Sequence, residues 1–193
     1  MAFKDFLRLT TLMLLLTAAG SLSHICAQPA ITQKSGSISF FSSTPVEDIK
    51  AENSSFTSSI NPADSTVVFT VPVTGFEFRK RLMQQHFNDQ YMESKKFPVA
   101  TFRGKLAQPI PPYDGTLTTF RTRVTGELTI RDITREIDEV VEITRSSDEM
   151  DALAEFIVRP ADFGIKIPRM LIKNIAEEIK VTISVLYSIN SEK

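Results

Sequence analysis

The feature that most constrains the fold of this chain is a strict alternation of apolar and polar residues. It is clearest over residues 179–189, where every second side chain is apolar and most of those between are polar. Successive side chains of a β-strand point to opposite faces, so this pattern predicts a strand with one buried and one exposed face. The same alternation recurs at 67–73, 100–106 and 124–130, and more weakly at 38–40, 49–56, 137–143 and 152–158.

These eight segments predict a mainly β protein. Turn-forming residues separate them at 61–64, 113–115, 131–132 and 146–148. One-sided strands suit an antiparallel sandwich or barrel, because an antiparallel sheet can keep one face in water. We favour an antiparallel eight-stranded β-barrel, since closure removes exposed strand edges. A barrel of this size is either filled by its own side chains or wide enough for one small ligand.

The period changes over residues 75–92, which predicts a short amphipathic helix. We interpret this helix as a plug for one end of the barrel, with a gate over an entrance as the alternative. The basic run at 79–81 is typical of a solvated face, although it could also touch anionic headgroups and permit a transient membrane contact. The apolar residues at helical spacing are Phe78, Leu82, Met83 and Phe87.

The first 27 residues resemble a secretory signal peptide. Lys4 and Arg8 precede a short apolar run at 12–19, which is shorter than a membrane-spanning helix of about 20 residues. We expect cleavage after Ala27, leaving residues 28–193 as one β-barrel domain that is periplasmic or secreted. Acylation of Cys26 is an alternative, but a lipoprotein signal favours a small residue before the cysteine, and Ile25 is bulky.

Composition narrows the classes of function. Cys26 is the single cysteine, so the mature chain would have neither a disulfide nor a thiolate metal site. The formal net charge is -1 with acidic and basic residues interspersed, which gives no footprint for nucleic acid. We expect no cofactor and no metal.

Catalysis has little support in the sequence. His86 is the single histidine after the expected signal peptide, and no G-x-S-x-G sequence accompanies it. One histidine with scattered carboxylates also lacks the spacing of a metal site. We therefore expect a protein that is not an enzyme; an enzyme acting on a bound lipid through His86 is a distant third hypothesis.

Four segments carry a resemblance to the YceI-like family, and together they extend over nearly all of the mature chain. They are GSISFF at 36–41, the strand–helix–strand run at 71–106, VTGELTIRDITREI at 124–137 and RPADFGI at 159–165. The turn at Arg131-Asp132 departs from the family pattern, because relatives commonly have His-Gly there. This departure weakens any polar role carried over for that histidine.

The resemblance implies a lipocalin-like barrel, exported to the periplasm, that holds an isoprenoid, quinone or fatty-acid-like chain without turnover. Nine apolar residues of the expected inward faces would line its cavity: Phe40, Phe69, Val71, Phe102, Leu128, Ile130, Phe156, Val158 and Val181. Each of them could equally be an ordinary core residue. The identity of the lipid and the oligomeric state are not fixed by the sequence.

The residue types leave the interior of the barrel open to two interpretations. Small inward residues beside phenylalanines can leave a cavity or can complete a tightly packed core. These small residues are Ala100, Gly104, Gly126, Ala152 and Ala154. A filled barrel would instead favour a secreted interaction module that uses residues 109–113 or 170–175 as its contact surface.

Overall fold

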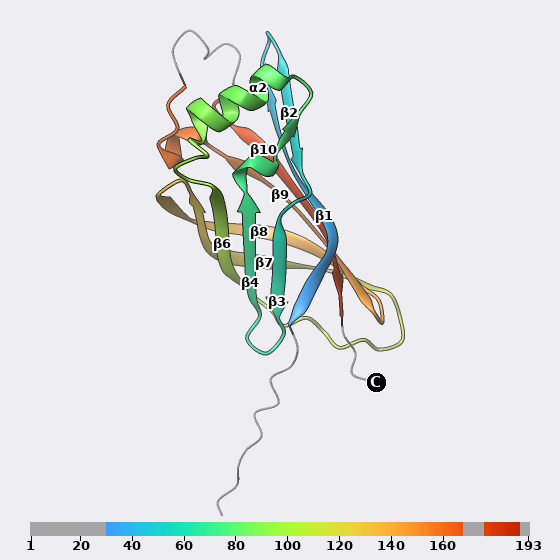
Figure 1. Cartoon of the computed structure of the whole chain (residues 1–193). Helices are drawn as coiled ribbons and strands as arrows, with labels where there is room; N and C mark the ends of the chain where they lie inside the picture. Colours follow the sequence, from blue (N-terminus) through green and yellow to red (C-terminus); the bar gives the residue numbers. More distant parts are fainter. Residues whose placement is uncertain (1–29, 168–175, 190–193) are drawn as a thin grey trace, which may run out of the picture.

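The computed structural model describes residues 30–167 and 176–189, and the expected signal peptide lies outside them. Within these residues the chain forms ten strands, all paired antiparallel (Figure 1). The strands are β1 (Ile31–Ser43), β2 (Asp48–Asn53), β3 (Thr57–Asn61), β4 (Thr66–Pro72), β5 (Glu77–Phe78), β6 (Val99–Leu106), β7 (Thr118–Ile130), β8 (Ile133–Arg145), β9 (Glu149–Val158) and β10 (Ile179–Ser188).

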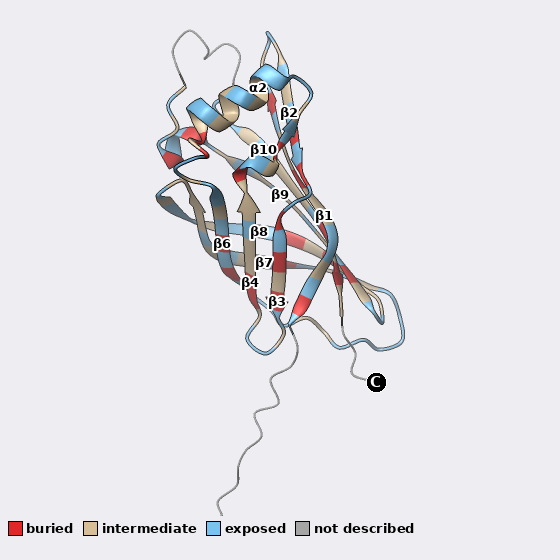
Figure 2. Ribbon diagram, viewed as in Figure 1, coloured by how far each residue is buried: buried red, intermediate tan, exposed pale blue. Residues whose placement is uncertain are grey.

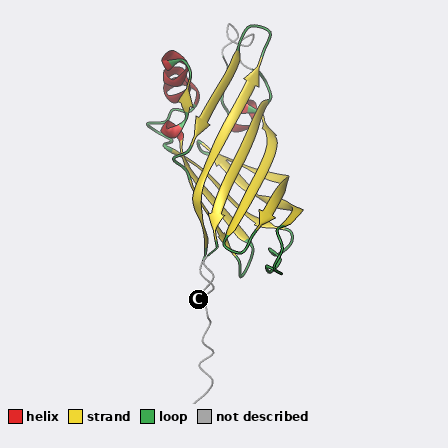
Figure 3. Ribbon diagram, turned by 90° about the vertical axis from the view of Figure 1, so that its right-hand side faces the viewer, coloured by secondary structure: helices red, strands yellow, loops and turns green. Residues whose placement is uncertain are grey.

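Eight of these strands close into a barrel, as the sequence predicted. Their order is β10-β9-β8-β7-β6-β4-β3-β1, and β1 pairs with β10 to complete the ring. β1 pairs with β3 through Ile31 and Thr32, and with β2 from Ile38 to Ser43. β2 and β3 lie on the same edge of β1, opposite β10, so β2 continues the wall beyond β3 towards the helical end of the barrel, where β5 pairs with it. The helices gather towards one end of the strands (Figure 3).

One part of the barrel wall extends beyond the segment expected from the sequence. The segment expected at 49–56 covers β2 and the following link, whereas β3, which continues along the same edge of β1 towards Ile31, was not expected. β3 has the sequence TSSIN, and its buried positions are Ser58 and Ile60. Since one inward side chain is a serine, the apolar alternation that marks the other strands is missing.

The end of the barrel opposite the helix is a packed floor (Figure 2). Five fully buried or nearly fully buried side chains from four strands meet there: Ile60, Ile143, Met150, Val185 and Tyr187. The Tyr187 hydroxyl lies 2.6 Å from the Ser58 hydroxyl, so the two buried polar groups satisfy each other. This part of the interior behaves as an ordinary core.

Two inward glycines allow strands β6 and β7 to approach closely at the floor. Gly104 and Gly126 face each other in the β6–β7 register. A Cβ on Gly126 would lie 2.3 Å from the Gly104 Cα, and a Cβ on Gly104 would lie 2.4 Å from the Phe102 ring. The missing side chains thus provide the space into which the Phe102 ring folds.

The other end of the barrel is covered by one short helix and the π-helical turn that follows. The helix α2 (Arg81–His86) passes directly into η2 (Phe87–Tyr91), where the Met92 amide donates to the Phe87 carbonyl at 2.8 Å. Met83 and Phe87 are half-buried, as expected for the apolar face. Phe78 belongs to β5 instead, and Leu82 is 62% exposed. Leu82 nevertheless reaches the rim of the cavity described below.

None of the helices in the described part of the chain is long and apolar enough to span a membrane.

Candidate ligand cavity

A cavity of about 550 Å³ occupies the barrel between the packed floor and the helix α2. Its walls come from the inward faces of all ten strands together with side chains of α2, η2, the segment between β4 and β5 and the segment after β9. Most of the wall is aliphatic or aromatic, so the space is suited to hydrocarbon rather than to a polar solute.

The structure places all nine sequence-derived candidates at the cavity wall. They are Phe40, Phe69, Val71, Phe102, Leu128, Ile130, Phe156, Val158 and Val181. Residues that face each other across an antiparallel pair share one side of the sheet. Phe69 faces Phe102, which in turn faces Leu128, and Val181 lies between Phe40 and Phe156. Their contact with a ligand stays a prediction.

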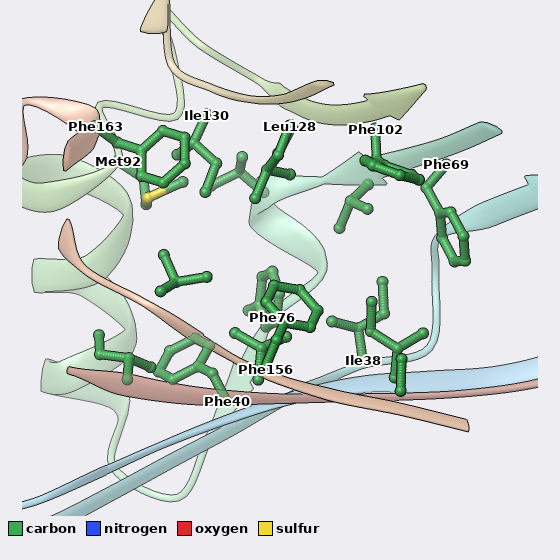
Figure 4. A pocket seen from close by; sticks show the side chains of 18 of the residues that line it. Ile38, Phe40, Phe69, Phe76, Met92, Phe102, Leu128, Ile130, Phe156 and Phe163 are labelled. Atoms are coloured by element: carbon green, nitrogen blue, oxygen red, sulfur yellow. The ribbon is translucent and has the colours of Figure 1, made fainter. Parts of the chain in front are cut away.

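The candidates lie at different depths in the barrel (Figure 4). Phe102 is almost fully buried, and its ring centroid lies 6.3 Å from that of Phe69. Phe69 stacks in turn on Phe56 at 5.9 Å. Phe69 and Phe102 therefore form the junction between the packed floor and the cavity.

The small inward residues separate into two groups. Ala100, Ala152 and Ala154 lie at the cavity wall, where their short side chains leave space. Gly104 lies under the Phe102 ring and Gly126 against the backbone of Arg103 and Gly104, so these two glycines serve close packing. Both interpretations of the small residues hold, each in its own half of the barrel.

Four phenylalanines near the helix form a cluster that the strand alternation did not predict as a unit. Phe40, Phe76, Phe78 and Phe87 have ring centroids 5.1–5.6 Å apart in five pairs. Edge-to-face and tilted contacts at this spacing stabilise beyond the area that they bury. The cluster attaches the start of η2 to β1 and β5, and so holds the helix over the cavity.

Polar side chains reach the cavity mainly at its mouth beside α2. The Lys80 ammonium forms an ion pair with Glu47 of the β1–β2 connection. His86 and Tyr91 also line this end, and burial raises the pKa of the Tyr91 hydroxyl. Near the end of β1 at the same side of the barrel, Ser42 is 1% exposed and its hydroxyl oxygen accepts from the Ala176 amide at 2.9 Å. The polar mouth and apolar interior suit an amphiphile with its tail inside.

The described residues provide no second group that would make His86 a catalytic base. No hydrogen bond joins its ring to another side chain within 30–167 and 176–189. In the same part of the chain, no group of three or more His, Cys, Asp or Glu residues is arranged to hold a metal ion. The arrangement of these residues can enclose an apolar chain.

A family comparison agrees with this geometry. The model of the YceI-like domain matches residues 30–187, which include every strand of the barrel except the last residue of β10. The chain belongs to the YceI-like domain family. A search of curated proteins finds no significant match.

Solved structures resemble this YceI-like domain in fold at low sequence identity. A polyisoprenoid binding domain from Saccharophagus degradans, implicated in plant cell wall breakdown, has a TM-score of 0.71 at 12% identity, covering 82% of this chain and 98% of that one. BcnA from Burkholderia cenocepacia has a TM-score of 0.64 at 16% identity, covering 78% and 95%. The Campylobacter jejuni YCEI protein has a TM-score of 0.54 at 16% identity, covering 92% and 96%.

Arg131 has a structural role in this YceI-like domain, at the turn where the sequence departs from the family pattern. It adopts a left-handed backbone with φ 59° between β7 and β8. Its guanidinium forms an ion pair with Glu93, lies 5.3 Å from the centre of the Phe97 ring and donates to the Gly164 carbonyl at 3.4 Å. The side chain thus joins the β7–β8 turn both to the segment after η2, through Glu93 and Phe97, and to Gly164 on the segment after β9.

The wall of the YceI-like barrel is incompletely paired between β8 and β9. Their register extends over Val141–Arg145 and Met150–Ala154, whereas β7 and β8 pair along the whole of β8. Above this point the segment η3 (Pro160–Phe163) packs against β8, and the buried Phe163 ring lines the cavity. Side-chain packing, rather than a strand ladder, closes this part of the wall.

Proposed function

We propose that this protein binds a single long apolar chain in its barrel, as a periplasmic carrier or sequestering protein without turnover. The observation that carries the proposal is the apolar cavity of about 550 Å³ with its polar mouth. The similarity in fold to a protein described as a polyisoprenoid binding domain supports an isoprenoid or quinone tail. A fatty-acid-like chain fits the same chemistry.

Burial of hydrocarbon supplies the driving force for such binding. Each methylene removed from water contributes about 0.8 kcal/mol, so ten carbons contribute on the order of 8 kcal/mol before the cost of ordering the chain. No charged anchor inside the barrel is required. The lipid headgroup would remain near Lys80, His86 and Tyr91 at the mouth, where water can still reach it.

The alternative of an interaction module rests on a completely filled barrel. The cavity disagrees with complete filling, although the floor is packed as that hypothesis expected. Of its two contact surfaces, the loop at 109–113 is largely exposed, while the segment at 170–175 lies outside the described residues.

The test is native mass spectrometry of the protein exported in a bacterial host, followed by organic extraction and identification of any small molecule. We expect a stoichiometric lipid with a long apolar chain. A mass that matches the bare polypeptide, even after quinones, prenols and fatty acids have been supplied, would contradict the proposal and favour the interaction module. The same spectrum tests export, because cleavage after Ala27 gives a chain that begins at Gln28 and carries no acyl group.

A further inference from the structure

Two large apolar side chains project into solvent beside the mouth of the cavity. Val46 lies in the β1–β2 connection and Leu82 in the first turn of α2, and each is 62% exposed. The Glu47–Lys80 ion pair joins these two elements, so it holds both apolar side chains at the same end of the barrel (Figure 1). Single exposed apolar residues are common, but this pair adjoins the opening of an apolar cavity.

Basic side chains flank these apolar residues. Arg79 and Arg81 are exposed on either side of Lys80. Neither forms an ion pair with a carboxylate among residues 30–167 and 176–189. Of the acidic groups on the facing connection, Glu47 is already paired with Lys80, and Asp48 accepts from the Ser43 hydroxyl. Asp48 keeps its charge in that hydrogen bond, and exposed Glu77 lies on β5, but neither carboxylate pairs with Arg79 or Arg81.

An exposed aromatic ring extends this surface onto the barrel wall. Phe41 is 41% exposed near the upper end of β1, and its neighbours across the strands are Lys50 of β2 and Lys180 of β10. The Lys180 ammonium is paired with Glu155 at 2.9 Å. An aromatic ring between lysines suits the boundary between headgroups and hydrocarbon, since the ring buries apolar area while the ammonium groups remain in water.

We propose that this end of the barrel docks on a membrane that contains anionic lipids. Val46 and Leu82 enter the headgroup region while Arg79 and Arg81 contact lipid phosphates. The inference rests on the proposed function, because a docked mouth gives an apolar chain a path between bilayer and cavity that avoids water. The favoured partner is a lipid surface rather than a protein, since the apolar residues, the free positive charges and the opening of the cavity all lie at one end.

The helix α2 is too short to span a bilayer, so the contact would be peripheral and reversible. The affinity for the membrane depends on the apolar area inserted below the headgroups and on the electrostatic attraction between the arginines and the lipid phosphates. The attraction weakens as salt screens the arginines. Near an anionic surface each basic side chain contributes about fivefold in affinity at low salt. We therefore expect binding to anionic vesicles that falls as salt is raised, and weak binding to zwitterionic ones.

The experiment is co-sedimentation of the full chain with two kinds of vesicle, phosphatidylcholine alone and phosphatidylcholine mixed with phosphatidylglycerol. The test variant combines Val46→Ser, Arg79→Gln and Arg81→Gln, none of which lines the cavity. Loss of two charges predicts a drop of about 25-fold in affinity for the mixed vesicles, before the apolar loss is counted. The matched control combines Leu117→Ser, Arg103→Gln and Lys105→Gln, exposed residues of the β6–β7 region away from the mouth.

Three outcomes would overturn docking by the mouth. They are wild-type protein that does not bind the mixed vesicles, a test variant that binds as tightly as wild type, and a control variant that loses as much affinity as the test variant. Lipid extracted from the same preparations separates this inference from the proposed function. Retained lipid with no vesicle binding contradicts docking alone, whereas a bare polypeptide that still docks contradicts the carrier function and the lipid-exchange role of docking together.

Discussion

Substitution of Ala154 by tryptophan would test the cavity directly. Ala154 lies on β9 at the cavity wall, and its neighbours across the strands are Ile183 and Val141. Its methyl group leaves space that a larger ring can occupy. The outward neighbour Leu153 is 45% exposed and provides a matched control on the same strand, Leu153→Trp.

The structure sets the size of the expected effect. An indole is larger than benzene, which fits a protein cavity of about 150 Å³. The substitution would therefore remove at least roughly a quarter of the cavity of about 550 Å³. A methylene occupies about the volume of a water molecule, ~30 Å³, so about five methylenes are displaced. At about 0.8 kcal/mol each, the loss is on the order of 4 kcal/mol, or about a thousandfold in affinity.

The assays are lipid content by native mass spectrometry and the free energy of unfolding by urea titration. For Ala154→Trp we expect little or no bound lipid. When both proteins have been stripped of lipid, we expect the free energy of unfolding to change by less than about 1 kcal/mol, because the ring enters empty space. Overpacking a filled core would instead cost about 1–3 kcal/mol. Lower stability with unchanged lipid content would refute the reasoning, and so would an equal loss of lipid in Leu153→Trp.

Three further predictions concern the parts of the fold that surround the cavity. Gly126→Ala should lower the free energy of unfolding by about 1–3 kcal/mol because its Cβ meets the backbone of β6, whereas Thr125→Ala, which faces solvent, should change it by less than about 0.5 kcal/mol. Burial raises the pKa of Tyr187 to about 12. The unfolded chain therefore ionises this hydroxyl first, and the free energy of unfolding should decline by up to about 1.4 kcal/mol per pH unit between pH 10 and pH 12 in urea titrations. Tyr187→Phe should remove that part of the decline. Arg131→Ala should accelerate hydrogen exchange of the amides at 93–97, because the ion pair with Glu93 and the contact with the Phe97 ring hold this segment in place. Exchange no faster than in Arg135→Ala, a variant of an exposed arginine, would contradict this role.

Much of the fold could be predicted because one inward face per strand is apolar. The expected strand at 179–189 corresponds to β10 (Ile179–Ser188) almost residue for residue. β3 escaped prediction because Ser58 occupies an inward position, where its hydroxyl is satisfied by a tyrosine 129 residues away. A local pattern cannot show that a polar side chain has a distant partner.

The same limit of a local pattern explains which features of the cavity could be predicted and which could not. Alternation determines which side chains face inward, and all nine predicted residues accordingly lie at the cavity wall. It does not determine depth along the barrel, so Phe102 at the floor and Phe40 beneath the helix were indistinguishable in the sequence. Phe76 was missed because it lies between strands, where no period of two applies. The available signal for Phe76 was the Phe-x-Phe sequence at 76–78, just before the helix.

The short ladder between β8 and β9 has a consequence for the range of molecules that one such barrel can hold. In a fully hydrogen-bonded barrel, strand number and stagger fix the girth, so the interior has one width. Here the ladder stops at Val141 and Ala154, and the packing of Phe163 closes the wall above it. An outward shift of η3 would widen the part of the cavity next to Phe163 without breaking a β8–β9 hydrogen bond. Side-chain packing at η3 therefore limits the width of the ligand. A few substitutions there can change that width while the strand architecture stays the same.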